Sequence, residues 1–280
     1  MLEPLPVQSM LRDYGLKPQK RLGQNFLVDE LYLERIVQAA DVNLADTVLE
    51  IGAGLGSLTR HLAVSAGNVA AVEIDQHLFS ALKKVVKPFD NVQLVQGDFM
   101  EMNITDLIST DGYKVVANIP YYLTSNLIRR LMEADVRPSM MVLTVQKEVA
   151  QRICAKPGKL SLLALGVQVY GEPRIAFPIP KGAFYPVPQV DSATLLIDLF
   201  PQPRVSTQQI DDFFLLTKAG FAQKRKMLHN ALASAPGINH DQAGELLAKA
   251  EIDPDRRAQT LTIEEWDILT RFFQEFRSKV

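Results

Sequence analysis

From about residue 46 onward, the chain alternates short runs rich in β-branched residues with amphipathic stretches. This alternation is typical of βαβ units, in which parallel strands are joined by crossover helices. It predicts an α/β fold with a mainly parallel seven-stranded sheet. The expected strands are Thr47–Ile51, Val69–Ile74, Val92–Val95, Lys114–Ala117, Met140–Val145, Pro173–Phe177 and Thr194–Leu199. Prolines between the last two exclude a crossover helix, so we expect this pair to form an antiparallel edge.

The pattern changes after the last expected strand. The segment Phe200-Pro-Gln-Pro-Arg204 interrupts it, and the remaining chain has helical periodicity. Helices are expected over 207–221, 222–234, 240–250 and 262–278. We therefore predict two domains, an α/β domain over residues 1–202 and a small all-α domain over residues 203–280.

Composition excludes several classes of protein. With 280 residues, 47% hydrophobic and 22% charged, the chain can bury a sizeable core and is not a disordered protein. No uncharged stretch approaches the ~18 residues of a membrane span. The first residues, Met1-Leu-Glu-Pro, lack the basic and apolar pattern of a secretory signal. We expect a cytoplasmic, monomeric protein that does not contact a membrane.

Metal-ligating residues are sparse. One cysteine, Cys154, excludes an internal disulfide and a cysteine-rich zinc site. The four histidines are far apart in the sequence and have no paired spacing. No metal site is expected.

A glycine-rich turn follows the first expected strand, in Val48-Leu-Glu-Ile-Gly52-Ala-Gly54-Leu-Gly56. Glycines between a strand and a helix let backbone amides approach a ligand closely. A dinucleotide fingerprint needs Gly-x-Gly-x-x-Gly, but Ser57 occupies its third glycine position. With Glu50 ahead of it, the turn resembles motif I of S-adenosylmethionine-dependent methyltransferases. A tight turn without a ligand is the structural alternative.

Acids follow the next two strands. Glu73 ends the second strand, about 20 residues after the glycines, where a carboxylate can accept hydrogen bonds from ribose hydroxyls. Asp75 is an alternative for the same role. Asp98, after the third strand, could accept a hydrogen bond from an adenine amine, or could simply cap a helix. Ligands of open α/β sheets bind at these strand ends, so the acids and the glycines predict an adenosine-containing ligand.

The fourth strand ends in Asn118-Ile119-Pro120-Tyr121, which resembles the Asn/Asp-Pro-Pro-Tyr signature of adenine amino methyltransferases. The Asn118 side-chain oxygen and the Ile119 carbonyl could accept both N–H groups of an adenine amine and direct its lone pair toward a methyl group. Pro120 would rigidify the turn, and Tyr121 could stack on the base. Phe184 could hold the other face of an extruded base. The alternatives are a plain turn for the tetrapeptide and a core position for Phe184.

Basic residues gather in two segments. Residues 213–232 contain Lys218, Lys224, Arg225 and Lys226 and no acid. Residues 147–160 contain Lys147, Arg152, Lys156 and Lys159 with one acid. Both segments are candidates for contacting RNA phosphates, and a solvated helix surface is the alternative.

Taken together, the motifs resemble those of the bacterial small-subunit rRNA adenine dimethyltransferases over residues 20–275. They are Gly23-Gln-Asn-Phe-Leu27, the glycine turn, Glu73, Gly97-Asp98, Asn-Ile-Pro-Tyr, Gln146-Lys-Glu-Val, Phe184–Ser192 and Phe221-Ala-Gln-Lys-Arg-Lys. The resemblance implies a class I (Rossmann-like) methyltransferase domain that uses S-adenosylmethionine to dimethylate N6 of two adjacent adenosines near the 3′ end of 16S rRNA. The implied partner is the small ribosomal subunit or its precursor. The cofactor would contact Asn25, Leu27, Gly52, Glu73, Asp98 and Asn118, and Tyr121 and Phe184 would enclose the base.

Two departures affect only details of pocket shape, since Tyr122-Leu123 and Ala53 replace residues that are frequent in the family. Three alternatives stay open. A 23S rRNA methyltransferase of macrolide-resistance type shares the Asn-Ile-Pro-Tyr site, although the basic run and the Arg256-Arg257 segment favour a small-subunit enzyme. An NAD-dependent oxidoreductase could use the glycine turn with Glu73. A non-catalytic nucleic-acid-binding relative is the third.

Overall fold

The computed structural model describes residues 2–119, 124–223 and 225–277. The chain divides into two compact units. The first comprises Met1–Ala150 and Pro173–Leu199, and the second comprises Gln151–Glu172 and Phe200–Val280. Pro120, Tyr121, Tyr122, Leu123 and Lys224, which the sequence singled out, lie outside the described residues.

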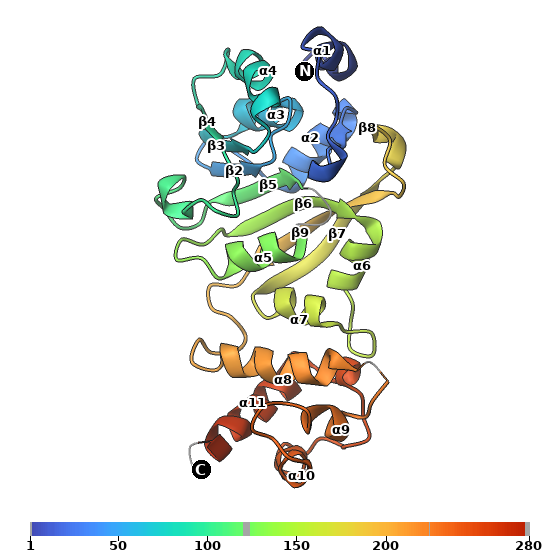
Figure 1. Ribbon diagram of the computed structural model, residues 1–280. Helices are drawn as coiled ribbons and strands as arrows, with labels where there is room; N and C mark the ends of the chain where they lie inside the picture. The colour runs from blue at the N-terminus through green and yellow to red at the C-terminus, as the bar shows by residue number, and fades with distance from the viewer. Residues whose placement is uncertain (1, 120–123, 224, 278–280) are drawn as a thin grey trace. The chain divides into compact units, whose positions relative to one another are not determined.

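Within the described residues, the first unit is built on a seven-stranded sheet of order β4-β3-β2-β5-β6-β9-β7 (Figure 1). Its strands are β2 (Thr47–Ile51), β3 (Asn68–Glu73), β4 (Val92–Gln96), β5 (Lys114–Asn118), β6 (Met140–Gln146), β7 (Gly171–Ile179) and β9 (Ser192–Leu199). The pairs β2–β3, β3–β4, β2–β5 and β5–β6 are parallel, and β6–β9 is antiparallel. The predicted mainly parallel sheet is confirmed, and so is the pairing of its last two strands as neighbours.

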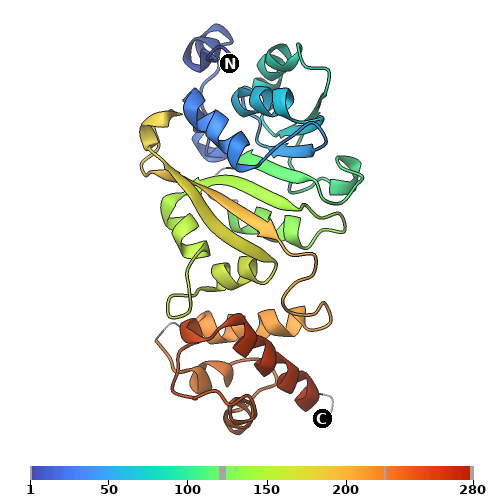
Figure 2. The same ribbon diagram turned by 180° about the vertical axis from the view of Figure 1, so that it is seen from behind.

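The central strands are apolar because helices cover both faces of the sheet. In β5 and β6 the valines, leucines and alanines are all buried. In Figure 1, α5 (Thr124–Met132) and α6 (Lys147–Ile153) lie in front of the sheet, whereas Figure 2 shows α2 (Glu30–Ala39) on the opposite face. Helices α3 (Ser57–Ser65) and α4 (Gln76–Val86) follow β2 and β3.

The register of the parallel strands sets the position of the site. Ile51 pairs with Val72, and Glu73 pairs with Gln96. The glycine turn and Glu73 therefore leave the sheet at the same edge, the carboxyl edge of the parallel strands, and Asn118 ends β5 beside β2. This is the edge at which open α/β sheets bind ligands.

A two-stranded sheet joins distant parts of the first unit. Strand β1 (Phe26–Leu27) pairs antiparallel with β8 (Phe184–Tyr185). Helix α1 (Val7–Asp13) packs nearby, in a cluster with Phe26, Leu55 and Leu78. The sequence analysis did not predict α1, β1 or β8. The two strands could not be predicted, because two-residue strands carry no measurable periodicity.

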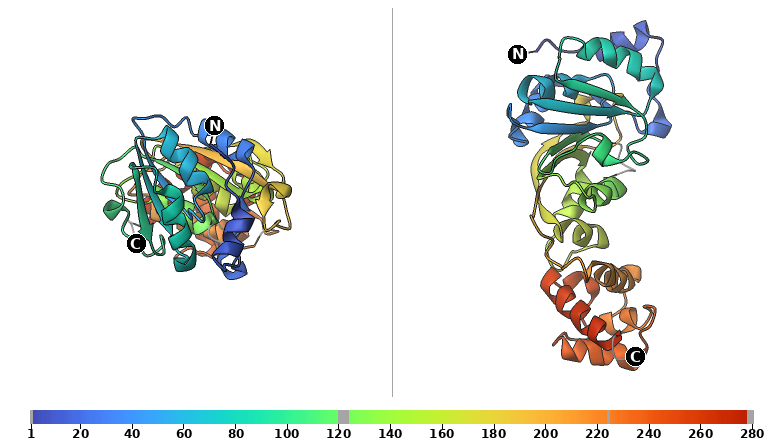
Figure 3. Two further views of the ribbon diagram at one scale, coloured as in Figure 1. Left: turned by 90° about the horizontal axis from the view of Figure 1, so that it is seen from above. Right: turned by 90° about the vertical axis from the view of Figure 1, so that its left-hand side faces the viewer.

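The helices of the second unit are drawn in Figure 3 and include α7 (Leu162–Gln168), α8 (Ile210–Ala222), α9 (Leu228–Leu232), α10 (His240–Lys249) and α11 (Ile263–Arg277). Its largest fully buried side chains are Phe213, Trp266 and Phe273. The predicted helix over 222–234 is wrong in its first half. Gln223 adopts an extended conformation that ends α8, and α9 begins only at Leu228, whose N–H donates to the Arg256 carbonyl at 2.7 Å. No helix among the described residues is long and apolar enough to span a membrane.

The segment Gln151–Glu172 belongs to the second unit, whereas the predicted boundary lay at residue 202. Its residues contact the helices that follow the sheet. The Tyr170 and Phe214 rings stack with centroids 6.5 Å apart, and the Gly158 N–H donates to the Gln259 carbonyl at 2.8 Å. These contacts join residues 44 and 101 positions apart in the chain, which local composition cannot indicate.

Candidate functional site

A pocket lies at the carboxyl edge of the sheet. It is lined by Leu22, Gly23, Gln24, Asn25, Phe26, Gly52, Gly54, Glu73, Ile74, Leu78, Asn118 and Ile119. The structure thus brings together six residues that the sequence predicted as a site: Asn25, Gly52, Gly54, Glu73, Asn118 and Ile119. They come from segments that are distant in the sequence.

Glu73 is the buried acid of this pocket, with 4% of its surface exposed. Its Oε2 accepts a hydrogen bond from the Gly54 N–H at 2.6 Å, and its Oε1 accepts one from the Asp75 N–H at 2.7 Å. Burial raises the pKa of the Glu73 carboxyl, and these backbone donors oppose the shift. The glycine turn and Glu73 are therefore joined by a direct hydrogen bond.

Gly54 meets a steric requirement at this point. Its φ is +61°, and a Cβ atom there would lie 3.2 Å from the Phe26 ring. A side chain would thus be strained in backbone conformation and crowded against the pocket wall.

Asp75 does not line the pocket. It is buried and caps α4, since its Oδ1 accepts from the His77 N–H at 3.0 Å. Its Oδ2 accepts from the side-chain amides of Gln19 and Gln24. Of the two acids that the sequence left as alternatives, Glu73 lines the pocket. The carboxylate of Asp75 instead accepts hydrogen bonds from protein groups.

Asn118 supplies a polar group on the β5 side. Its Nδ2 donates to the Asn25 carbonyl at 3.1 Å, which leaves Oδ1 as the acceptor end of the amide. Ile119 follows it and is 2% exposed. An amine with two N–H groups needs acceptors of this kind, which Oδ1 and a backbone carbonyl provide.

Three predicted site residues are not among those that line the pocket. Leu27 and Phe184 are 3% and 2% exposed, pair with each other across β1 and β8, and pack in the main core cluster. Asp98 is half-buried, and its Oδ1 accepts from the Met100 N–H at 2.8 Å, as in a turn cap. In this structure Phe184 holds the position of a core anchor, because strand pairing turns its ring inward; its contact with a base remains a prediction.

Six lining residues were not predicted as site residues from the sequence: Leu22, Gly23, Gln24, Phe26, Ile74 and Leu78. Ile74 follows β3 and Leu78 lies in the first turn of α4, and the two give the pocket an apolar wall that suits an aromatic base. Their only sequence signal is their proximity to Glu73. Gln24 lies inside the Gly23–Leu27 motif, so the motif itself could have indicated it.

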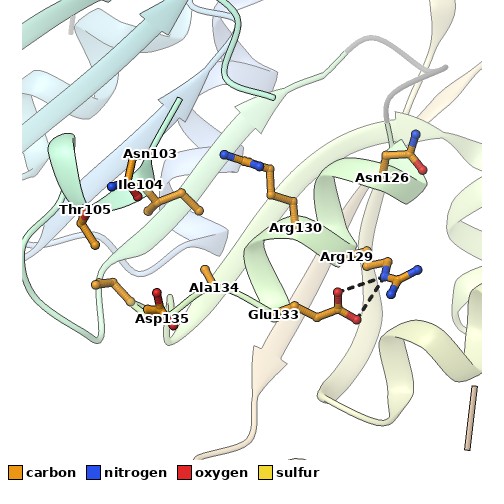
Figure 4. Close-up of a pocket in the computed structure, with 10 residues that line it drawn as sticks. Asn103, Ile104, Thr105, Asn126, Arg129, Arg130, Glu133, Ala134 and Asp135 are labelled. Carbon is orange, nitrogen blue, oxygen red and sulfur yellow. Dashed lines mark hydrogen bonds and ion pairs between the residues drawn. The ribbon is translucent and has the colours of Figure 1, made fainter. Parts of the chain in front are cut away.

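A separate recess of about 500 Å³ lies beside α5 (Figure 4). It is lined by Asn103, Ile104, Thr105, Asn126, Arg129, Arg130, Glu133, Ala134, Asp135 and Val136, and contains none of the predicted cofactor residues. In Figure 4 the Arg129 side chain bonds to Glu133, while Arg130 extends away from that pair. Arg130 donates to the Met102 carbonyl and lies over the Phe99 ring, so it ties α5 to the turn that follows Asp98.

Of the predicted RNA-contacting residues that the structure describes, Lys147 lies in the first unit, and the second unit contains Arg152, Lys156, Lys159, Lys218, Arg225 and Lys226. Arg152, Lys156, Lys218, Arg225 and Lys226 are exposed. Within the described part of the chain, no ion pair is formed by any of the five. Grouping Gln151–Glu172 with the helical segment thus collects two basic stretches, separated by about sixty residues in sequence, in one unit.

A family model described as ribosomal RNA adenine dimethylase matches residues 15–271. A ribosomal RNA small subunit methyltransferase A from Dehalococcoides mccartyi (strain CBDB1) is 45% identical over 261 residues, covering 92% of this chain and 89% of that protein. Two solved structures share the fold at 24% identity. A dimethyladenosine transferase from Plasmodium falciparum has a TM-score of 0.76 and covers 88% of this chain and 96% of its own. The 23S rRNA methyltransferase ErmE has a TM-score of 0.71 and covers 88% and 98%.

Proposed function

The chain belongs to the ribosomal RNA adenine dimethylase family, and we propose that it dimethylates N6 of two adjacent adenosines near the 3′ end of 16S rRNA. The relatives that support the choice of RNA are named small subunit methyltransferases. Family membership argues against an NAD-dependent oxidoreductase. The likeness to a 23S rRNA enzyme concerns the fold alone.

We propose S-adenosylmethionine as the methyl donor, and the pocket residues fit it. A buried carboxylate, Glu73, suits two ribose hydroxyls, and the Gly52–Gly54 turn lets the backbone approach a ligand. Ile74 and Leu78 suit an adenine face. When bound there, the cofactor supplies an electrophilic methyl group on a sulfonium.

One observation carries the proposal for catalysis: Asn118 and Glu73 line the same pocket, and Asn118 presents an acceptor oxygen beside Ile119. The adenine amine is a weak nucleophile because its lone pair is delocalised into the ring. Acceptance of both N–H groups by Asn118 Oδ1 and the Ile119 carbonyl would draw that nitrogen toward tetrahedral geometry. No basic side chain is then required, and the amine proton leaves to solvent after transfer.

The base must leave its stack to reach such a pocket. We propose that Tyr121 stacks on the extruded base and that Pro120 rigidifies the turn between it and Asn118, as their places in the motif suggest. The cations Arg152, Lys156, Lys218, Lys224, Arg225 and Lys226 would hold the RNA backbone. We propose further that the protein acts as a monomer on the small subunit or its precursor in the cytoplasm.

The direct test supplies methyl-labelled S-adenosylmethionine and under-methylated small subunits to the protein and maps the labelled bases. We expect label on two adjacent adenosines near the 3′ end of 16S rRNA. Label on 23S rRNA alone, or none, would overturn the proposal.

The matched variant for the catalytic step is Asn118→Ala. It should lower turnover at saturating cofactor by about 100-fold, because misplacing the reacting amine has costs of this order. Cofactor affinity is measured separately, because Asn118 also lines the pocket and bonds to Asn25. Asn103→Ala, an exposed asparagine outside the pocket, is the control and should turn over like the wild type. Near-normal turnover of Asn118→Ala would show that the amine is activated by another group.

A further inference from the structure

The segment Gln19–Asn25 crosses the pocket and is hydrogen-bonded on both sides of it. We call this segment the strap. It includes the short 3₁₀ helix Lys20–Leu22, and four of its residues line the pocket: Leu22, Gly23, Gln24 and Asn25. None of its seven residues is buried, so apolar packing contributes little to its position.

On one side, the strap is fixed to Asp75. The side-chain amides of Gln19 and Gln24 donate to the same oxygen, Asp75 Oδ2, at 2.8 and 2.7 Å. Gln24 Oε1 in turn accepts from the Gln19 N–H at 2.7 Å, which closes a ring of hydrogen bonds. Asp75 is 5% exposed, so both amides bind a charged group that is shielded from water.

On the other side, the strap is fixed to Asn118. The Asn25 carbonyl accepts from Asn118 Nδ2 at 3.1 Å, and the Asn25 side chain donates back to the Gly23 carbonyl at 3.1 Å. The same strap therefore bonds to Asp75 and to Asn118, the residue that we propose to bind the target amine.

Hydrogen bonds connect Asp75 to the glycine turn through Glu73. The Asp75 N–H donates to Glu73 Oε1, and Glu73 Oε2 accepts from the Gly54 N–H. A path of hydrogen bonds thus runs from Gln24 through Asp75 and Glu73 to Gly54. Displacing the strap would disturb the same carboxylate that faces the proposed ribose.

We infer that Gln19 and Gln24 are positioning residues, which act through Asp75 to hold the strap closed over the bound cofactor. The inference rests on the proposed function for the identity of the cofactor. The glutamines need not touch the ligand, because their effect is to keep Asn25, Gly23 and Leu22 against it. No side chain of the strap itself is buried, so its closed position depends on the hydrogen bonds from the Gln19 and Gln24 amides to Asp75.

The first test is Gln24→Met, which removes both hydrogen-bonding ends while retaining the length of the side chain. Gln93→Met, at an exposed position of β4, is the matched control. We expect calorimetry to show at least tenfold weaker S-adenosylmethionine binding for Gln24→Met and wild-type binding for the control. The KM for the cofactor should rise in parallel, while kcat at saturating cofactor and the melting temperature stay near wild type.

The second test is a double-mutant cycle with Asp75→Asn. An asparagine keeps the oxygen that caps α4, but it places an amide donor where the glutamines need an acceptor. If the glutamines act through Asp75, the losses of affinity in Gln24→Met and Asp75→Asn should not add. Hydrogen exchange of the cofactor-free protein should also be faster over residues 20–25 in each variant.

These outcomes separate the inference from the proposed function. If the wild type does not bind S-adenosylmethionine, the cofactor assignment fails. If the wild type binds it and the folded double variant Gln19→Met/Gln24→Met binds it equally well, the positioning role fails. Additive losses in the cycle would also contradict the inference, because they would show that the glutamines act independently of Asp75.

Discussion

At the scale of single residues, Glu50 stands out as a carboxyl group in the core of the first unit. It is 1% exposed, and its Oε2 is buried without a hydrogen-bond partner among the described residues. Desolvation, with a smaller contribution from the charge of Glu73, raises the pKa of Glu50 from 4.5 to about 8, although an interaction with the Thr59 hydroxyl opposes the shift. Glu50 is therefore mainly protonated at neutral pH in the folded protein.

This pKa makes stability depend on pH. Between pH 4.5 and about 8 the folded protein holds a proton at Glu50 that the unfolded chain releases. The free energy of unfolding should therefore fall as pH rises through this window, by about 1.4 kcal/mol per pH unit from this group. Glu50→Gln should flatten the dependence and be the more stable protein near pH 8, as denaturant titrations at pH 5, 6.5 and 8 can measure. Glu101→Gln, at an exposed position, controls for the removal of one carboxyl group. Parallel curves for Glu50→Gln and wild type would contradict the assignment.

At the scale of elements, α8 and α11 approach closely at Gly220. A Cβ atom at this position would lie 2.6 Å from the Trp266 ring and 3.3 Å from the Ala258 Cβ. Trp266 is fully buried, so its ring cannot move outward. The glycine thus permits a contact between two helices of the second unit that a larger residue would block.

We expect Gly220→Ala to destabilise the protein. Alanine is favoured over glycine in a helix by about 1 kcal/mol, but overpacking of a core costs about 1–3 kcal/mol, and at this position the steric cost should dominate. Gly166→Ala on α7 is the matched control, because the nearest atom to its added Cβ is 4.0 Å away. Thermal and denaturant unfolding should show a decrease in stability for the first variant and an increase for the second. An increase for both would mean that Trp266 can repack.

At the scale of the whole molecule, the formal charge of -2 conceals an uneven distribution. Exposed cations without ion pairs, including Lys218, Arg225 and Lys226, occur in the second unit among the described residues. Neutralising these three to glutamine should weaken RNA binding and reduce its salt dependence, because each cation that binds a phosphate contributes about 0.7–0.9 to the salt slope. The same adenosines should still be modified, because phosphate-binding cations carry little sequence information.

Lys249→Gln provides the control for this experiment, since Lys249 belongs to the same unit but is paired with Glu245 at 2.8 Å. Binding of ribosomal subunits, measured over a range of salt concentrations, should be unchanged in that variant. A wild-type salt slope in the triple variant would identify the three cations as a solvated surface and direct attention to Arg152 and Lys156.

The parallel sheet, the glycine turn and the acids at the strand ends could be predicted from the amino-acid sequence, because each depends on local periodicity or on residue types adjacent in the chain. The sequence also determined the family, through an ordered set of motifs. The folded structure was needed to show that Glu73 faces the pocket while Asp75 binds Gln19 and Gln24, and that strand pairing buries Phe184. It also assigned Gln151–Glu172 to the helical unit. These outcomes depend on hydrogen bonds and packing between residues far apart in the chain, and such interactions leave no periodic trace in either segment alone.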